Sequence, residues 1–412
     1  MSKIEELIKK LCPNGVEYKT LGELGRFYGG ITGKSKEDFK DGNAKFITYK
    51  NVYENISLKL DVEDKVKISE KENQRTLEYG DIIFTGSSET PNECGLSSVV
   101  TEKVEEKLYL NSFCFFFRMN NKEILNPDFA KHLFRSSNLR YQIGKTASGV
   151  TRFNVSKKAM EKVRIPVPPL EVQCKIVHIL DDFTLLSAEL SAELKARQKQ
   201  YEYYNCNLLK FENIPYYTLE ELCDIVDYRG KTPKKTNEGI FLVTAKNIRK
   251  GYIDYEKSQE FISEQDYAEV MRRGMPKVGD VLITTEAPCG NVAQVDDENI
   301  ALAQRVIKYR PKDNRLDSTF FKYILLGEEF QTKLNGKATG GTVKGIKGSI
   351  LHKLTIPLPS IEEQRKIVKI LDRFNKLCND ISEGLPAEIN ARQKQYEYYR
   401  DKILTFKMIG DW

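Results

Sequence analysis

The feature that most constrains this chain is a long internal repeat. Residues 165–183 match residues 356–374 at twelve of 19 positions, at an offset of 191. The nonapeptide Ala-Arg-Gln-Lys-Gln-Tyr-Glu-Tyr-Tyr occurs at 196–204 and again, unchanged, at 391–399. A period near 190 residues is long enough for a whole domain and a connecting helix. The repeat therefore predicts a duplicated domain, not a solenoid.

The segments between these blocks correspond more loosely. Gly80-Asp81 pairs with Gly279-Asp280, and Cys94-Gly95 pairs with Cys289-Gly290. We expect four parts: a globular domain at 1–165, a helix at 166–211, a second globular domain at 212–355 and a second helix at 356–412.

The two variable segments have the composition of mixed α/β domains. Runs of β-branched and aromatic residues bounded by Gly predict strands at 46–49, 81–85 and 281–285. The apolar run 113–117 predicts a buried strand, and short helices are expected near 126–136 and 318–326.

The repeated blocks predict long helices. After Pro169, apolar residues recur at steps of three, four or seven as far as Phe211, which gives one apolar stripe. A helix from Glu171 to Phe211 would be about 60 Å long. Because a helix with one apolar stripe needs a partner, we expect it to pack antiparallel against the second copy (362–406) as a coiled coil. Pro386 predicts a break in that copy near residues 382–386.

Basic residues are clustered, although the net charge is only +6 from 65 basic and 59 acidic residues. Residues 131–164 hold nine Lys or Arg and one acidic residue, and residues 322–355 hold six Lys and two acidic residues. Clusters of this kind, interspersed with Gly, Ser, Thr and Asn, favour contacts with phosphates and base edges. The alternative is a solvated surface loop.

Two of these loops, 146–154 and 338–344, combine Gly, hydroxyl groups and a basic residue. Arg and Asn are the side chains that read guanine and adenine in a major groove. The candidate DNA-binding residues are Lys34, Lys36, Lys50, Asn51, Thr151, Arg152, Asn154, Arg229, Lys231, Lys234, Lys246, Asn247, Thr342, Lys344 and Lys347.

Catalytic and metal-binding patterns do not emerge from the sequence. Gly33-Lys34-Ser35 resembles the end of a phosphate loop, but Tyr28 stands where a Walker A loop needs Gly. The eight Cys form no CxxC pair, and the three His are far apart, so we predict neither a catalytic nor a metal site. The absence of a secretory signal and of a membrane-spanning run predicts a cytoplasmic protein with reduced thiols.

Taken together, these motifs resemble the specificity subunits of type I restriction–modification systems. The resemblance rests on two variable segments, each followed by Ile-Pro-x-Pro, Gln-x-Lys-Ile-Val and the repeated nonapeptide. It implies two target recognition domains that read the halves of a bipartite, asymmetric sequence in double-stranded DNA. It also implies that the helices form a spacer and dock two methyltransferase subunits, with restriction subunits in the full complex. S-adenosylmethionine, ATP and Mg²⁺ would then be bound by those partners and not by this chain. The residues expected to form the spacer and the docking surfaces are Gln173, Leu186, Leu190, Leu194, Tyr201, Tyr204, Gln364, Tyr396 and Tyr399.

Within the first helix, residues 186–189, 190–193 and 194–197 form tandem four-residue units. We hypothesise that the number of units sets the gap between the half-sites. Two other functions stay open at this stage: a coiled-coil adaptor without DNA specificity, and a self-contained nuclease with an unrecognised site.

Overall fold

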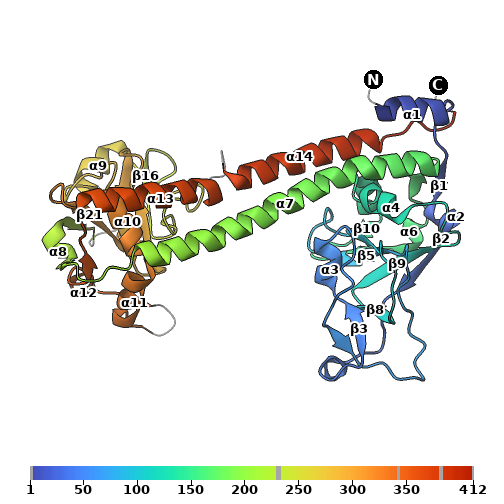
Figure 1. Cartoon of the computed structure of the whole chain (residues 1–412), viewed down its shortest axis with the longest axis horizontal. Coiled ribbons are helices and arrows are strands. Elements are labelled where there is room, and N and C mark those ends of the chain that lie inside the picture. The colour runs from blue at the N-terminus through green and yellow to red at the C-terminus, as the bar shows by residue number, and fades with distance from the viewer. Residues whose placement is uncertain (1–2, 229–232, 341–343, 380–383, 411–412) are drawn as a thin grey trace. The chain divides into compact units, whose positions relative to one another are not determined.

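The computed structural model describes residues 3–228, 233–340, 344–379 and 384–410. The chain forms two compact units. The first unit comprises residues 1–191 and 388–412, and the second comprises residues 192–387. Each unit therefore holds one of the predicted globular domains together with part of each predicted long helix (Figure 1).

The centre of the first unit is a four-stranded antiparallel sheet with strand order β2-β9-β5-β7. Alternate residues of a strand point to opposite faces, and here both faces are buried. Phe84, Phe115 and Phe117 join one core cluster, whereas Ile83 and Phe116 join another. The predicted strand at 113–117 is confirmed from Cys114 onward. The strands are β1 (Tyr18–Thr20), β2 (Gly25–Gly29), β3 (Ala44–Ile47), β4 (Lys65–Val66), β5 (Ile82–Thr85), β6 (Ser87–Ser88), β7 (Ser97–Val99), β8 (Leu108–Leu110), β9 (Cys114–Met119), β10 (Ala147–Ser148), β11 (Phe153–Val155) and β12 (Arg164–Pro166).

Smaller sheets and short helices surround this sheet. Strands β4-β3-β8 and β10-β11-β6 form three-stranded sheets. The helix expected at 126–136 is present, but it is shorter and a second helix follows it directly. The helices are α1 (Lys3–Leu11), α2 (Leu21–Leu24), the 3₁₀ helix η1 (Lys36–Phe39), α3 (Tyr49–Glu54), α4 (Pro127–Leu133), α5 (Ser137–Gly144) and α6 (Lys157–Met160).

The second unit repeats this plan. Its central sheet has the order β14-β21-β18-β19, and a second sheet has the order β15-β17-β16-β20. The predicted strand at 281–285 and helix at 318–326 are confirmed to the residue. The elements are β13 (Tyr216–Thr218), α8 (Leu219–Leu222), β14 (Cys223–Asp227), β15 (Lys235–Thr236), β16 (Ile240–Val243), β17 (Phe261–Ile262), α9 (Glu264–Val270), β18 (Val281–Thr285), β19 (Cys289–Gln294), β20 (Ile300–Leu302), β21 (Val306–Pro311), α10 (Ser318–Leu326), α11 (Glu328–Lys337), α12 (Gly348–Leu351) and β22 (Thr355–Pro357).

A buried ion pair braces each central sheet in the same way. Arg118 on β9 donates through Nε and Nη2 to the two carboxylate oxygens of Asp81, at 2.8 and 2.6 Å. Arg310 on β21 makes the same two bonds to Asp280, at 2.6 and 2.7 Å. These bonds raise the pKa of both guanidinium groups. The Gly-Asp pair seen twice in the sequence therefore marks a structural element of the duplicated domain.

Long helices connect to the sheets of both units. Helix α7 (Leu170–Leu208) has 39 residues, and the second copy consists of α13 (Ile361–Asn379) and α14 (Leu385–Ile403). In the first unit α14 runs beside the early part of α7, and the Phe183 and Tyr399 rings stack with centroids 5.5 Å apart (Figure 1). In the second unit the later part of α7 lies beside α13, and Tyr204 stacks on Phe374 at 5.4 Å.

The predicted break at 382–386 falls partly on residues 380–383, which lie outside the described residues. Helix α13 ends at Asn379 and α14 begins at Leu385. Pro386 therefore stands in the first turn of α14, where its missing N–H leaves no hydrogen bond unmade. Among the helices of the described residues, none is long and apolar enough to cross a bilayer.

Candidate DNA interface and helix surfaces

A small three-stranded element lies at the end of the central sheet in the first unit. Beyond β5 the chain continues into β6, which pairs with β11, and β11 pairs with β10. Ser87 faces Asn154, and Asn154 faces Ser148. The loop 146–154, which the sequence singled out for its Gly, hydroxyl groups and basic residue, is thus the hairpin β10–β11.

The second unit builds the same element with fewer strand residues. Glu286 bridges Gly345, and Gly345 bridges Thr339. Counting from the two central strands, Glu286 corresponds to Ser87 and Gly345 corresponds to Asn154. The described ends of the second predicted loop (338–340 and 344) therefore correspond to the ends of the first, while residues 341–343 lie outside the described residues.

A hollow of about 520 Å³ adjoins the hairpin of the first unit. Arg152 lines it and donates from Nε to Ser87 Oγ at 3.1 Å. Across the hollow, Tyr53 donates to Glu93 at 2.8 Å, and this bond holds the pKa of the Glu93 carboxyl below its usual range. The lining residues are Tyr49, Tyr53, Ser87, Ser88, Glu89, Glu93, Phe113, Thr151 and Arg152. Aromatic faces, hydroxyls, carboxylates and a guanidinium together offer every kind of contact that a base edge can use.

The second unit has a hollow of about 380 Å³ in the corresponding place. Arg305 Nε lies 3.0 Å from Glu286 Oε2 at its wall. Lys347 also lines it, and Lys344 is exposed nearby in the sequence. The lining residues are Thr285, Glu286, Gln304, Arg305, Thr339, Gly345, Ile346 and Lys347. The two units therefore share the backbone frame of the hollow, meaning the pairing of the segment after β5 or β18 with the later loop of the same unit, but the side chains that line the hollow differ.

The predicted lysines of the first unit fall into two groups. Lys36 and Lys50 are exposed, and Lys50 is 3.8 Å from Glu54. Lys34 has a side chain only 8% exposed and donates to Glu72 at 2.7 Å. Lys36 and Lys50 can therefore reach a phosphate, whereas Lys34 is held within its own domain.

The two predicted asparagines hold loops in place. Asn247 is fully buried, accepts hydrogen bonds from the backbone and hydroxyl of Thr244 at 2.9 and 2.7 Å, and donates to backbone carbonyls of Asp254 and Lys257. Asn51 likewise exchanges hydrogen bonds with the backbone of Lys59. The prediction that Asn247 contacts DNA is therefore corrected, because its amide is buried and already satisfied.

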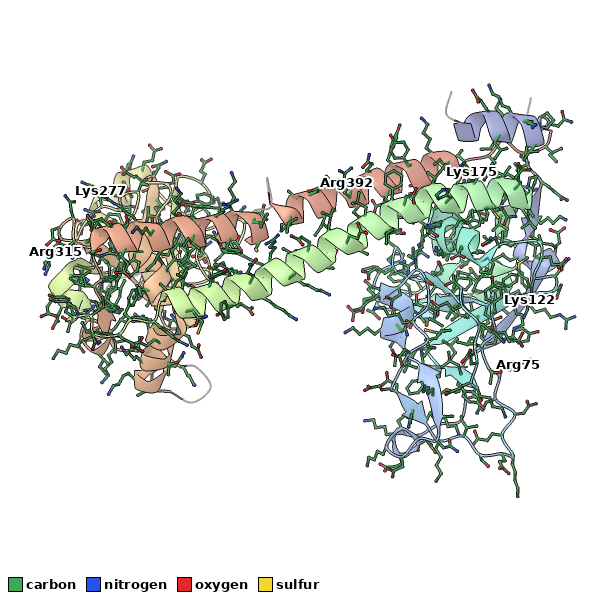
Figure 2. The ribbon with its side chains drawn as sticks, viewed as in Figure 1. Arg75, Lys122, Lys175, Lys277, Arg315 and Arg392 are labelled. Atoms are coloured by element: carbon green, nitrogen blue, oxygen red, sulfur yellow. The ribbon has the colours of Figure 1, made fainter. Side chains whose placement is uncertain are left out.

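The remaining DNA-binding candidates of the second unit lie either on its surface or outside the described residues. Lys234 and Lys246 are exposed. Arg229, Lys231 and Thr342 lie outside the described residues. In the first unit Thr151 and Asn154 are exposed beside Arg152 on the hairpin. Basic side chains elsewhere are spread over both units, for example Arg75 and Lys122 in the first and Lys277 and Arg315 in the second (Figure 2).

Two of the residues assigned to the helices have internal roles. Gln173 accepts from the Asn126 N–H at 2.8 Å and donates to the carbonyls of Ile124 and Pro168. Gln364 makes the same three bonds, with Asp317 N–H and the carbonyls of Arg315 and Pro359. Both glutamines are fully buried. They attach the start of each long helix to its own domain, which is a role within the spacer and leaves their amides without exposed surface.

The tyrosines of the repeated nonapeptide divide by position. Tyr396 is buried, and Tyr201 is partly buried beside Phe374. Tyr204 and Tyr399 are 36% and 37% exposed and stack across the helix pair. Leu186 is exposed, and Leu190 and Leu194 are partly buried along α7. Tyr201, Tyr204 and Tyr399 therefore contribute to the contact between the helices, whereas Tyr396 is buried against His132 of α4. Accessible surface remains on Leu186, Leu190, Leu194, Tyr204 and Tyr399.

Two exposed tyrosines were not among the predicted residues. Tyr203 is 66% exposed and Tyr398 is 62% exposed, at the same position of the two nonapeptides. Their neighbours match as well, since Arg197 donates to Gln200 and Arg392 donates to Gln395, both at 3.0 Å. Figure 2 places Arg392 on α14. Because the two nonapeptides are identical in sequence, the sequence alone could have indicated that these two helix faces are equivalent.

A family model described as the type I restriction modification DNA specificity domain matches residues 13–197 and again residues 212–391. The chain belongs to this family. The two matches span both duplicated halves, and the mixed α/β units with their long helices have the architecture expected from the resemblance.

Relatives and solved structures agree with this assignment. The EcoR124I/EcoR124II specificity subunit of Escherichia coli is 35% identical over 268 residues, which cover 61% of this chain and 65% of that protein. A putative type I restriction enzyme specificity subunit of Haemophilus influenzae is 32% identical, over 70% of this chain and 74% of its own. A structure of a type I R-M system aligns with 95% of this chain and 97% of its own, with a TM-score of 0.64 at 18% identity. The S subunit structure from M. genitalium aligns with 94% of this chain and 96% of its own, with a TM-score of 0.51 at 14% identity. At these identities the two structures support the fold alone.

Both hollows lie within the two matched ranges and outside the repeated helical blocks. Arg305, which lines the second hollow, was missed by the sequence analysis. It lies outside the basic clusters, and its position beside Glu286 depends on the pairing of β18 with β21. No charge count along the sequence could have revealed that pairing.

Proposed function

We propose that this chain is the DNA-recognition subunit of a type I restriction–modification complex and carries no catalysis of its own. Each unit would read one half of a bipartite, asymmetric target in double-stranded DNA. The observation that carries the proposal is the pair of hollows, which share one frame but differ in their lining side chains. Two readers built on one frame with different linings are what an asymmetric target requires.

The accessible part of the helices supports a scaffold role. The exposed tyrosines of the two nonapeptides present equal surfaces, one in each unit. Equal surfaces suit two copies of one partner, which would be the methyltransferase subunits. Restriction subunits would join in the full complex, and S-adenosylmethionine, ATP and Mg²⁺ would be bound by these partners. Since the target is cellular and incoming DNA, we place the complex in the cytoplasm.

Co-expression with the methyltransferase encoded beside this chain tests the proposal. Adenine methylation mapped at base resolution should define one motif made of two short half-sites with an unspecified gap. The purified complex should also bind duplex DNA with an affinity that falls linearly in log K against log salt.

Two results would favour other functions. A contiguous motif, or binding that does not respond to salt, would point to a coiled-coil adaptor without DNA specificity. Metal-dependent cleavage of DNA by the purified chain alone would point to a nuclease, and we expect none.

A further inference from the structure

Both hollows contain an arginine anchored at the same place, although the two arginines come from different segments. Arg152 lies between strands β10 and β11 of the hairpin, and its Nε donates a hydrogen bond to the Ser87 hydroxyl. Arg305 precedes β21 and lies against Glu286, also through Nε. Both anchors are thus contacted through Nε. The Nη1/Nη2 edge of a guanidinium is a bidentate donor that guanine O6 and N7 accept.

The equivalence of the two anchors follows from backbone hydrogen bonds. The Gly86 N–H donates to the Phe113 carbonyl at 2.8 Å, and the Thr285 N–H donates to the Arg305 carbonyl at 2.9 Å. Ser87 and Glu286 are the next residues in the chain. Arg305 therefore occupies, in the second unit, the position that Phe113 occupies in the first.

The backbone of Arg305 is held in an unusual conformation. Its φ is +73°, in the left-handed region that bulky L-residues rarely adopt. The hydroxyl of Thr285 also donates to the Arg305 carbonyl, at 3.3 Å, which fixes the residue in this conformation. A conformation of this kind persists where the surroundings enforce it, and such residues cluster at binding sites.

The charges around Arg305 favour a contact with a base over a contact with a phosphate. The side chains of Arg305 and Glu286 are 55% and 42% exposed, so the pair is accessible to a ligand. A carboxylate beside the guanidinium cancels its charge and repels phosphate, so this pair is poorly suited to the DNA backbone. A donor fork next to an acceptor is suited to a G·C base pair, because Arg donates to guanine and Glu can accept from cytosine N4.

We infer that Arg305, positioned by Glu286, reads a guanine in the half-site of the second unit, and that Arg152, positioned by Ser87, does so in the first. This inference rests on the proposed function and deepens it. It names one specificity-determining side chain in each half of an otherwise undefined target.

The test is methylation mapping with arginine variants, co-expressed with the methyltransferase. Arg305→Ala should relax one G·C position in one half-site, lowering discrimination there by about tenfold or more, and leave the other half-site unchanged. Arg152→Ala should relax one position in the opposite half-site. Arg272→Ala is a matched control in the second unit, because Arg272 is an exposed arginine paired with Glu269 at 2.6 Å. It should leave the motif intact.

A second variant separates recognition from folding. Arg305→Asn should keep the left-handed backbone, which Asn tolerates, and should therefore retain thermal stability while losing discrimination. Two results would overturn the inference: wild-type stringency in both Arg305 variants, or relaxation of the same half-site by the Arg152 and Arg305 variants. In either case a bipartite motif in the wild type would still support the proposed function. A wild-type complex that methylates without sequence preference would instead overturn the proposed function.

Discussion

His132 Nε2 lies 2.8 Å from Asp181 Oδ1, and its Nδ1 lies 2.8 Å from the Tyr396 hydroxyl. The ring is fully buried and joins α4 to α7 and α14. Burial lowers the pKa of His132, against the opposing attraction of Asp181. Lys131 and Asp128 also face this group, and Lys131 contacts both carboxylates. Although burial alone would raise it, the pKa of Asp181 is lowered by bonds from His132 and Lys131.

These shifts predict that the first unit loses stability in mild acid. The unfolded chain binds a proton at His132 below about pH 6.5, whereas the folded chain resists it. The free energy of unfolding should therefore fall as the pH drops below about 6.5, by at most about 1.4 kcal/mol per pH unit, and level off below the folded pKa. The lowered pKa of Asp181 adds stability that is lost only at much lower pH. Urea unfolding followed by circular dichroism between pH 7.5 and 5.5 measures the effect.

The substitution His132→Gln should make the loss over this pH range smaller. His178→Gln is the control, since the His178 side chain is 70% exposed and its removal takes away no buried ring. An equal loss in wild type and His132→Gln would contradict the assignment.

The two buried carboxylates of the central sheets should both matter, but not equally. Asp81→Ala leaves Arg118 paired with Glu78, whereas Asp280→Ala removes the carboxylate shared by Arg310 and the buried Lys308. Removing one member of a buried pair costs about 3–5 kcal/mol when the other charge stays uncompensated. We expect Asp280→Ala to lose this much in urea unfolding and Asp81→Ala to lose less. The control Glu37→Ala removes an exposed pair with Lys40 and should cost less than about 1 kcal/mol. A loss below about 1 kcal/mol in either Asp variant would show that its pair is not needed.

The sequence predicted the architecture well because duplication is visible in any one-dimensional comparison. It predicted the functional side chains less well, and particular residues show why. Gln173 and Asn247 look like surface contacts in the sequence, but both are buried. Gln173 bonds to a segment almost fifty residues earlier, whereas the Asn247 amide is enclosed by its own loop, which returns to it through the carbonyls of Asp254 and Lys257. Phe113 belongs to an apolar run, yet it is 60% exposed, because the strand begins one residue later. Exposure at a strand end depends on register, which local patterns do not encode.

Identical helix surfaces predict two identical docking sites. We expect Tyr203→Ala to remove one methyltransferase copy from the complex, Tyr398→Ala to remove the other, and the double variant to remove both. The reason is that both rings are mostly exposed in this chain, and truncating an aromatic ring at the centre of an interface often costs about 2 kcal/mol or more of binding free energy. Native mass spectrometry of the co-purified complex counts the copies. Tyr252→Ala is the control, because Tyr252 is 58% exposed but lies outside the long helices. Retention of two copies by the double variant would place docking elsewhere.

The four-residue units of α7 predict how the gap between half-sites is set. They lie inside one continuous helix, so a change in their number is transmitted along it without a loop to absorb it. One unit is about 6 Å of helix and about 40° beyond a full turn, and one base pair of B-DNA turns by about 35°. Deleting 190–193 should therefore shorten the gap by about one base pair, and duplicating the unit should lengthen it by the same amount, with both half-sites unchanged. Ser191→Ala, which keeps the length, is the control and should leave the gap as it is. Methylation mapping measures the gap in all three variants. An unchanged gap in the deletion variant would reject the idea that the number of Leu-x-Ala-Glu units sets the gap. The units would then be explained by their favourable helix propensity alone.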